Sequence, residues 1–255
     1  MGVLDGKHAL ITGGGSGIGA AIARTLAQAG AAVSIAGRRA GPLEEVAAQL
    51  PRTKAIVADV TSEADCVAMV AAAREAHGPI DILVANAGAA ESAPAAKIDL
   101  AHWQRMLDVN LTGAFLSVKA ALGDIARGDG QGRRIVFIAS TAGLKGYTYV
   151  AAYCAAKHGV VGLARALAAE LAPRGVTVNA VCPGFTETPL LEASLVNIAA
   201  KTGRTRAEAA TDLKRLNPQG RFITPQEVAE TVLWLCTPAA QSITGQAISV
   251  SGGEV

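Results

Sequence analysis

Short apolar segments alternate with longer helical patterns along nearly the whole chain, and this alternation limits the possible folds more than any other feature. Each apolar segment is hydrophobic almost throughout, which is typical of a strand buried on both faces. Strands that alternate with helices form parallel sheets with right-handed crossovers. We therefore predict one α/β domain over residues 1–255, a doubly wound parallel sheet with helices on both faces. About seven strands are expected, at 8–12, 32–36, 54–58, 82–85, 134–139, 176–181 and 246–250.

The composition excludes several classes of protein. Hydrophobic residues make up 51% of the chain and charged residues 17%, which argues against disorder. The 23 basic and 21 acidic residues nearly balance, so we expect no nucleic-acid partner. No membrane-spanning stretch or signal peptide is recognisable, and we expect a cytoplasmic protein. The four cysteines and four histidines show no ligand spacing, and no metal site is predicted.

A glycine-rich turn, Gly13-Gly14-Gly15-Ser16-Gly17-Ile18-Gly19, joins the first predicted strand to the first predicted helix. Glycines allow backbone N–H groups to approach a pyrophosphate, and the start of the helix favours negative charge. The sequence therefore predicts a dinucleotide site. Its candidate residues are Gly13, Ser16, Gly17, Ile18 and Gly19.

The residues after the second strand distinguish NADP(H) from NAD(H), and those after the third strand could contact the adenine. An acid after the second strand would bind the ribose hydroxyls of NAD, whereas arginine accommodates a 2′-phosphate. Gly37 is followed by Arg38 and Arg39, which favours NADP(H) and leaves NAD(H) as the alternative. Asp59 and Val60 end the third strand, where the carboxylate either contacts adenine or caps the following turn.

Tyr153 and Lys157 lie four residues apart, on one face of a predicted helix. A cation about 4 Å away contributes roughly 4 kcal/mol at an effective dielectric of about 20, enough to lower a phenol pKa of about 10 by roughly 3 units. We therefore expect a phenol tuned for proton transfer. Ser140 ends the preceding strand, and Asn110 lies within a helical pattern at 99–127, either as an ordinary helix side chain or at a backbone distortion.

These motifs occur in the order found in the short-chain dehydrogenase/reductase family, and the chain resembles that family from Lys7 to Gly253. Ala85 departs from the pattern, since many members carry asparagine there. The resemblance rests on seven matches: the Thr12–Gly19 turn, Asp59, Asn86-Ala87-Gly88, Asn110, Ser140, Tyr153 with Lys157, and Pro183-Gly184 with Thr188.

The resemblance implies a Rossmann-like fold and hydride transfer between a nicotinamide and a ketone or secondary alcohol. In the reducing direction, Tyr153 would donate the proton, Lys157 would lower its pKa and hold the nicotinamide ribose, and Ser140 would bind the substrate oxygen. Asn110 would anchor a water. Tyr147 is expected to contact substrate. Cofactor contacts are also expected from Asn86, Ala87, Gly88, Pro183, Gly184 and Thr188.

The substrate is less constrained. Residues 185–217 look like an irregular insertion that covers the site as a lid. An apolar start and six basic against two acidic residues between Lys201 and Arg221 would suit an acyl chain on coenzyme A or an acyl-carrier protein, although an ordinary lid with a solvated face is equally consistent.

The overall pattern resembles 3-oxoacyl-thioester and polyketide ketoreductases, and an NADPH-dependent ketoreductase is the leading interpretation. The alternative is an NAD-linked dehydrogenase of a small, cyclic, steroid or sugar alcohol. A catalytically idle nucleotide-sensing scaffold is a remote alternative, because Ser140, Tyr153 and Lys157 are all present. By resemblance, helices at about 99–127 and 150–172 would pair between subunits, giving a homotetramer or homodimer.

Overall fold

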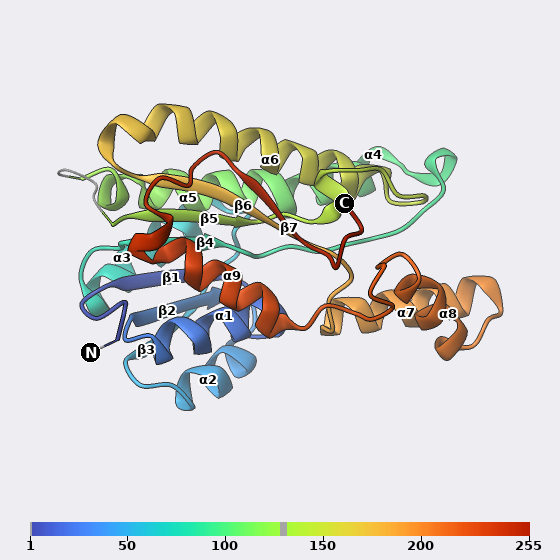
Figure 1. Ribbon diagram of the computed structural model, residues 1–255, viewed down its shortest axis with the longest axis horizontal. Coiled ribbons are helices and arrows are strands. Elements are labelled where there is room, and N and C mark those ends of the chain that lie inside the picture. Colours follow the sequence, from blue (N-terminus) through green and yellow to red (C-terminus); the bar gives the residue numbers. More distant parts are fainter. Residues whose placement is uncertain (1, 128–131) are drawn as a thin grey trace.

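The computed structural model describes residues 2–127 and 132–255 and contains one seven-stranded parallel sheet (Figure 1). The strand order is β3-β2-β1-β4-β5-β6-β7, so the direction of winding reverses between β1 and β4. Ligands bind at such a reversal, beyond the carboxyl ends of the strands. The predicted doubly wound sheet is confirmed. The strands are β1 (His8–Thr12), β2 (Ala32–Gly37), β3 (Thr53–Val57), β4 (Ile82–Ala85), β5 (Arg134–Ile138), β6 (Thr177–Pro183) and β7 (Ala247–Val250).

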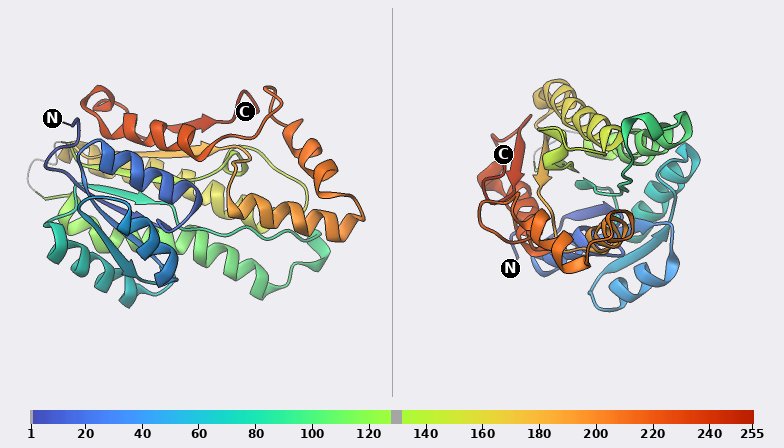
Figure 2. Two further views of the ribbon diagram at one scale, coloured as in Figure 1. Left: turned by 90° about the horizontal axis from the view of Figure 1, so that it is seen from below. Right: turned by 90° about the vertical axis from the view of Figure 1, so that its right-hand side faces the viewer.

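Helices cover both faces of the sheet (Figures 1 and 2). One face packs against α3 (Glu63–His77), α5 (Gly113–Ile125) and α6 (Ala151–Leu171). The other packs against α1 (Gly17–Gln28), α2 (Ala40–Ala48) and α9 (Pro225–Cys236). Every residue of β1, β4, β5 and β6 is buried, because these mainly apolar strands have helices or loops packed against both faces. Burial on both faces holds the strand ends in fixed positions.

The pattern at 99–127 forms two helices instead of one. α4 (Leu100–Leu107) and α5 are joined by η2 (Asp108–Thr112), a single π-helical turn. The side chain of Asn110, inside this turn, donates to the carbonyls of Met106 and Ala89, each at 2.9 Å. The backbone distortion considered from the sequence is therefore present, and its polar side chain is buried and satisfied.

The sequence predicts an irregular insertion at 185–217, but most of this region is helical. It contains α7 (Pro189–Thr202) and α8 (Arg206–Lys214), which extend beyond the carboxyl ends of the strands (Figures 1 and 2). Thr188 caps α7, and Thr205 with Glu208 forms a capping box on α8. The two helices, here called the helical arm, share a small apolar cluster of Leu191, Leu195, Ala209 and Phe222.

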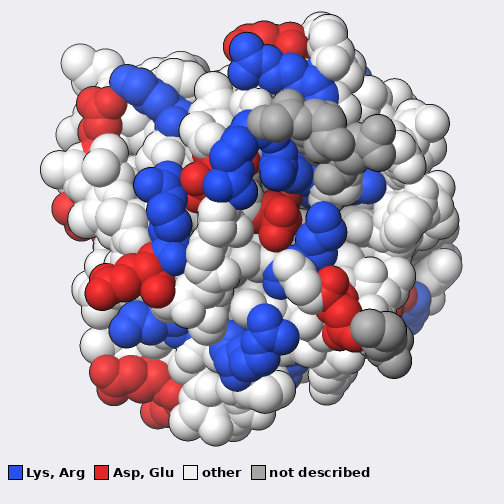
Figure 3. All heavy atoms as spheres, turned by 90° about the vertical axis from the view of Figure 1, so that its left-hand side faces the viewer, with Lys and Arg blue, Asp and Glu red and all other residues white. Residues whose placement is uncertain are grey.

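The opposite end of the molecule, at the amino ends of the strands, has a mixed charge (Figure 3). Lys and Arg side chains lie among Asp and Glu on this face. Arg133 and Asp81, directly before β5 and β4, form one such pair. Across residues 2–127 and 132–255, no helix is long and apolar enough to cross a membrane. Within the same ranges no group of three or more His, Cys, Asp or Glu side chains is placed to hold a metal ion.

Candidate active site

A cavity of about 980 Å³ lies at the carboxyl ends of the strands. Its walls come from the glycine-rich turn, the loops after β4, β5 and β6, and the helical arm. The structure thus brings the sequence-predicted residues of five separate segments to one place, as the reversal of the strand order requires.

The shape of the glycine-rich turn requires glycines, and a hydrogen bond from Asn86 stabilises it. Gly13 and Gly17 have φ values of +68° and +53°, a region that favours glycine. A Cβ on Gly19 would lie 2.2 Å from the Gly13 carbonyl oxygen. The Asn86 amide donates to the Thr12 carbonyl at 2.8 Å, which ties the turn to the end of β4. The amide of Asn86 therefore acts on the shape of the turn.

The start of α1 fits an anionic group. Ser16 occupies the N-cap position, but its side chain makes no capping hydrogen bond, and the first turn carries no acid. Its N–H groups face the side of the cavity lined by Ser16, Gly17 and Ile18, where the helix dipole favours negative charge. A pyrophosphate fits this donor set.

A second hollow of about 170 Å³ adjoins the turn and suits the adenosine end of a dinucleotide. Arg38 and Arg39 line it and are exposed. Asp59 and Val60 line it as well. The Asp59 carboxylate accepts hydrogen bonds from the Thr61 backbone N–H at 2.9 Å and from the Thr61 hydroxyl at 2.8 Å. It therefore has the capping role that the sequence left open.

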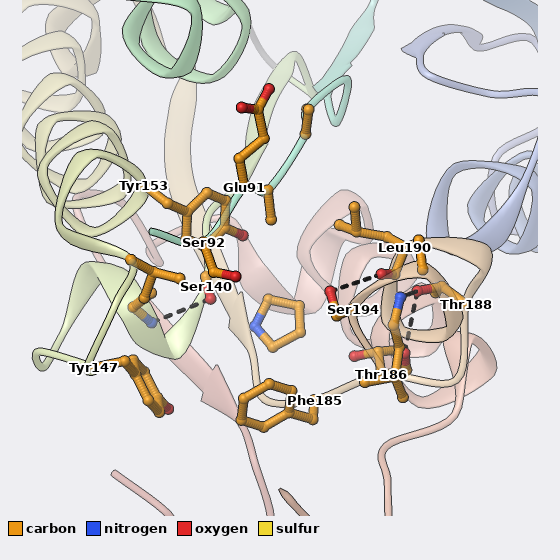
Figure 4. Close-up of a pocket in the computed structure, with 18 of the residues that line it drawn as sticks. Glu91, Ser92, Ser140, Tyr147, Tyr153, Phe185, Thr186, Thr188, Leu190 and Ser194 are labelled. Carbon is orange, nitrogen blue, oxygen red and sulfur yellow. Dashed lines mark hydrogen bonds between the residues drawn. The ribbon is translucent and has the colours of Figure 1, made fainter. Parts of the chain in front are cut away.

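Tyr153, Lys157 and Ser140 come together beside the cavity. Ser140 lies at the end of β5, and Tyr153 and Lys157 share one face of α6. Figure 4 shows Ser140 near the Tyr153 ring, and the Ser140 hydroxyl accepts from the Ala142 backbone N–H at 3.1 Å. The Lys157 ammonium is only 4% exposed, donates to the Ile138 carbonyl at 2.8 Å, and lies 5.6 Å from the centre of the Tyr153 ring.

The expected lowering of the phenol pKa is not found. Burial raises the pKa of Tyr153 to about 12, and the hydrogen bond with Ser140 offsets only part of that rise. Burial also lowers the pKa of Lys157 to about 8. The sequence estimate omitted desolvation, which disfavours the charged form of both groups. Near neutral pH the phenol is consequently protonated, the form that can donate a proton.

Asn110 and Lys157 both lie close to Gly88. A Cβ on Gly88 would lie 2.7 Å from Asn110 Oδ1 and 3.7 Å from Lys157 Nζ. Asn110 Oδ1 also accepts from the Ala89 backbone N–H at 3.3 Å. The π-helical turn, the Asn86-Ala87-Gly88 segment and Lys157 therefore pack as one unit.

Pro183, Gly184 and Thr188 line the cavity at the end of β6. The Thr188 hydroxyl donates to the Thr186 carbonyl at 3.1 Å and accepts from the Leu191 N–H at 3.2 Å. A Cβ on Gly17 would lie 3.1 Å from the Thr188 methyl carbon. The start of the helical arm thus packs directly on the glycine-rich turn.

Most of the basic residues of the arm have acidic partners. Arg204 pairs with Asp212, Arg206 with Glu192, and Arg221 with Glu227 at 2.6 Å. Lys214 lies over the Phe222 ring. Lys201, which lines the cavity, donates to the Ser92 carbonyl at 3.1 Å. The predicted basic flank is therefore largely neutralised, by Asp212 within the counted stretch and by Glu192 and Glu227 outside it.

Two residues that contact Tyr147 were not identified from the sequence. Phe185 contacts Tyr147 edge to face, with ring centres 5.9 Å apart. Glu254 accepts a hydrogen bond from the Tyr147 hydroxyl at 2.5 Å. The pair of glycines before Glu254 was the available signal, because paired glycines after a strand permit a sharp reversal of the chain.

The burial of Lys157 generates a pH prediction. Its pKa is about 8 when folded and near 10.5 when unfolded, so between these values the unfolded chain binds more protons, and the free energy of unfolding should rise with pH. We expect the free energy of unfolding of the wild type, minus that of Lys157→Met, to increase by up to about 3 kcal/mol across this interval. Urea denaturation at several pH values measures it. The exposed control Lys97→Met should show no such rise, and a flat or falling difference for Lys157→Met would contradict the assignment.

Comparisons with known proteins agree with this geometry. The family model for short chain dehydrogenases matches residues 7–199. A candidate ketoacyl reductase of Streptomyces coelicolor is 41% identical over 261 residues, covering 99% of this chain and 98% of that protein.

Two solved structures share the fold closely. A single-site variant of the actinorhodin polyketide ketoreductase with NADPH is 39% identical, with a TM-score of 0.93, covering 100% of this chain and 99% of that one. The 3-ketoacyl-(acyl-carrier-protein) reductase of Brucella melitensis complexed with NADH is 35% identical, with a TM-score of 0.89, covering 98% of this chain and 99% of that one. The chain therefore belongs to the short-chain dehydrogenase family and is a nicotinamide-dependent oxidoreductase of alcohols and ketones.

Proposed function

We propose that the protein reduces a 3-oxoacyl thioester or a similar ketone with NADPH. The observation that carries this proposal is the meeting of Ser140, Tyr153 and Lys157 at one wall of a cavity that also contains the glycine-rich turn. The names of the ketoacyl reductase and polyketide ketoreductase relatives support the choice of substrate.

The bound nicotinamide would supply the hydride to the carbonyl carbon. Lys157 and Tyr153 would border its ribose, Arg38 and Arg39 would bind the 2′-phosphate, and Asp59 and Val60 would border the adenine. The remaining contacts would come from the residues that line the two hollows, namely Gly13, Ser16, Gly17, Ile18, Gly19, Asn86, Ala87, Gly88, Pro183, Gly184 and Thr188.

The chain's own residues would orient the ketone and provide the proton. The Ser140 hydroxyl, at the rigid end of β5, would donate to the carbonyl oxygen and hold it near Tyr153. The protonated phenol of Tyr153 would then give its proton to the developing alkoxide. The nearby Lys157 ammonium favours the phenolate that remains. Asn110 would hold the backbone around Lys157 in place and anchor a water that restores the proton.

The helical arm, at about 185–217, would act as the lid over the substrate. Leu190 on α7 and Leu216 just after α8 are 43% and 42% exposed and line the cavity, as does Tyr149, which is 64% exposed. Such a lining suits an acyl chain. A coenzyme A or acyl-carrier handle remains part of the proposal through Lys201 alone, since the arginines of the arm are paired.

We also propose a homotetramer or homodimer formed through α4, α5 and α6. Large apolar side chains are exposed on α4 and α5, with Leu100 at 78%, Trp103 at 36% and Phe115 at 43%. Burying them between subunits would remove apolar surface from water. A monomeric mass in solution would contradict this assembly.

Replacing the phenol tests the acid assignment. Tyr153→Phe removes only the hydroxyl, so we expect turnover of acetoacetyl-CoA to fall by a factor on the order of 10³, while NADPH binding is largely kept. Steady-state kinetics and fluorescence titration of NADPH measure the two effects. As a matched control, Tyr149→Phe should keep most of the turnover. Substantial residual activity in Tyr153→Phe would refute the role of its hydroxyl.

The arginines after β2 predict the cofactor preference. The wild type should have a higher kcat/KM for NADPH than for NADH. Arg38→Ala should lower the NADPH value by roughly 10- to 100-fold, since a charged hydrogen bond contributes about 1.5–3 kcal/mol, and should leave the NADH value nearly unchanged. The same two kcat/KM values measured for Arg39→Ala show how much each arginine contributes to the preference for NADPH. A wild type that prefers NADH would overturn the assignment.

A further inference from the structure

Glu254 places a buried carboxylate against the hydroxyl of Tyr147, a residue that lines the cavity. It follows Gly252 and Gly253, whose φ values of +65° and +95° turn the chain sharply after β7. The side chain is 1% exposed, and among the described residues its Oε2 atom has no hydrogen-bond partner. Burying a carboxylate is costly unless other groups compensate its charge. The partners of the other carboxylate oxygen, Oε1, must therefore compensate the buried charge of Glu254.

Two polar groups contact Glu254 Oε1, and a third contacts the Tyr147 oxygen. The Tyr147 hydroxyl donates to Oε1 at 2.5 Å, and Lys145 Nζ lies 3.1 Å away. The Thr141 Oγ1 atom lies 2.7 Å from the Tyr147 oxygen. Because the Tyr147 hydroxyl uses its one proton in the hydrogen bond to the carboxylate, the Thr141 hydroxyl must be the donor to the phenol oxygen. All three partners belong to residues 141–147, directly after Ser140.

These bonds fix the ring of Tyr147. Figure 4 shows Tyr147 and Phe185 facing each other below Ser140 and Tyr153, and the two rings meet at an interplanar angle of 84°. The phenol is held at its oxygen by Glu254 and Thr141, and Lys145 Nζ lies 5.0 Å from the ring centre. Rotating the ring into or out of the cavity would break a charge-assisted hydrogen bond, which is stronger than a neutral one.

We propose that Glu254 is a positioning residue that fixes Tyr147, packed beside Phe185, as a wall of the substrate cavity, and so determines which face of an extended ketone meets Ser140 and Tyr153. The inference rests on the proposed ketone reduction. Glu254 touches neither Ser140 nor Tyr153, and it acts through the hydroxyl of Tyr147. A ketone too small to reach the wall should be insensitive to it.

Glu254→Gln keeps the size of the side chain but removes its charge. With NADPH and acetoacetyl-CoA we expect a roughly tenfold higher KM, a kcat within about threefold of wild type, and a lower enantiomeric ratio of the alcohol formed. KM for acetone and the Kd for NADPH should stay within about twofold. The exposed control Glu75→Gln should match the wild type in every measurement.

A double-mutant cycle tests whether the effect passes through Tyr147. Tyr147→Phe should reproduce the changes in KM and enantiomeric ratio, and Glu254→Gln should add less than about twofold in that background. Fully additive effects, or a Glu254→Gln enzyme with the wild-type KM and enantiomeric ratio, would overturn the inference. A general loss of folding would instead lower kcat for both ketones and would also contradict a positioning role.

A measurement without turnover separates this inference from the proposed function. Fluorotyrosine incorporation gives one ¹⁹F resonance for each of the three tyrosines, and Tyr147→Phe identifies its signal. Glu254→Gln should shift and narrow that signal, because the freed ring moves faster. An unchanged signal would overturn the inference even if the wild type reduced no ketone. Failure of the wild type on every ketone, with the signal shifted, would count against the proposed function alone.

Discussion

The buried ammonium of Lys157 is the constraint on which the rest of the site depends. A cation that is 4% exposed is costly to bury, and within the described part of the chain its only hydrogen bond goes to the Ile138 carbonyl at the end of β5. Its neighbours accommodate that arrangement. Gly88 leaves room where a Cβ would crowd Asn110, and the π-helical turn places Asn110 against the same segment. The sheet therefore supplies both the acceptor for the cation and the rigid frame around it.

Around this centre, separate segments each fix one side of the cavity. The Asn86 amide holds the glycine-rich turn, and Thr188 packs the start of the helical arm against the same turn. Glu254 holds Tyr147 from the far side. Each contact joins residues distant in sequence through a partly buried hydrogen bond or a close approach to a glycine. The cavity is thus shaped before any ligand binds, as expected of a pre-organised site.

Much of the fold followed from the sequence, because the central strands are mainly apolar and several helices begin at recognisable residues. The Thr224-Pro225 start of α9 is an example. The helices of the arm were missed because few of their apolar residues are buried, in a small cluster with Phe185 and Phe222, and they give a weak periodic pattern. Likewise, the pairing of Arg206 with Glu192 joins two helices, which a count of charges cannot show. The rise in the pKa of Tyr153 was missed because spacing along a helix carries no information about desolvation.

The central claim is that this centre transfers a hydride from NADPH to a ketone carbon of a 3-oxoacyl thioester. The most direct measurement is mass spectrometry of the product formed from acetoacetyl-CoA with NADPH deuterated at the nicotinamide C4, using each C4 stereoisomer in turn. The account predicts one deuterium on the new carbinol carbon from one stereoisomer and none from the other. A product without deuterium from either, or no reduction of the thioester while a simple secondary alcohol is oxidised with NAD, would contradict it.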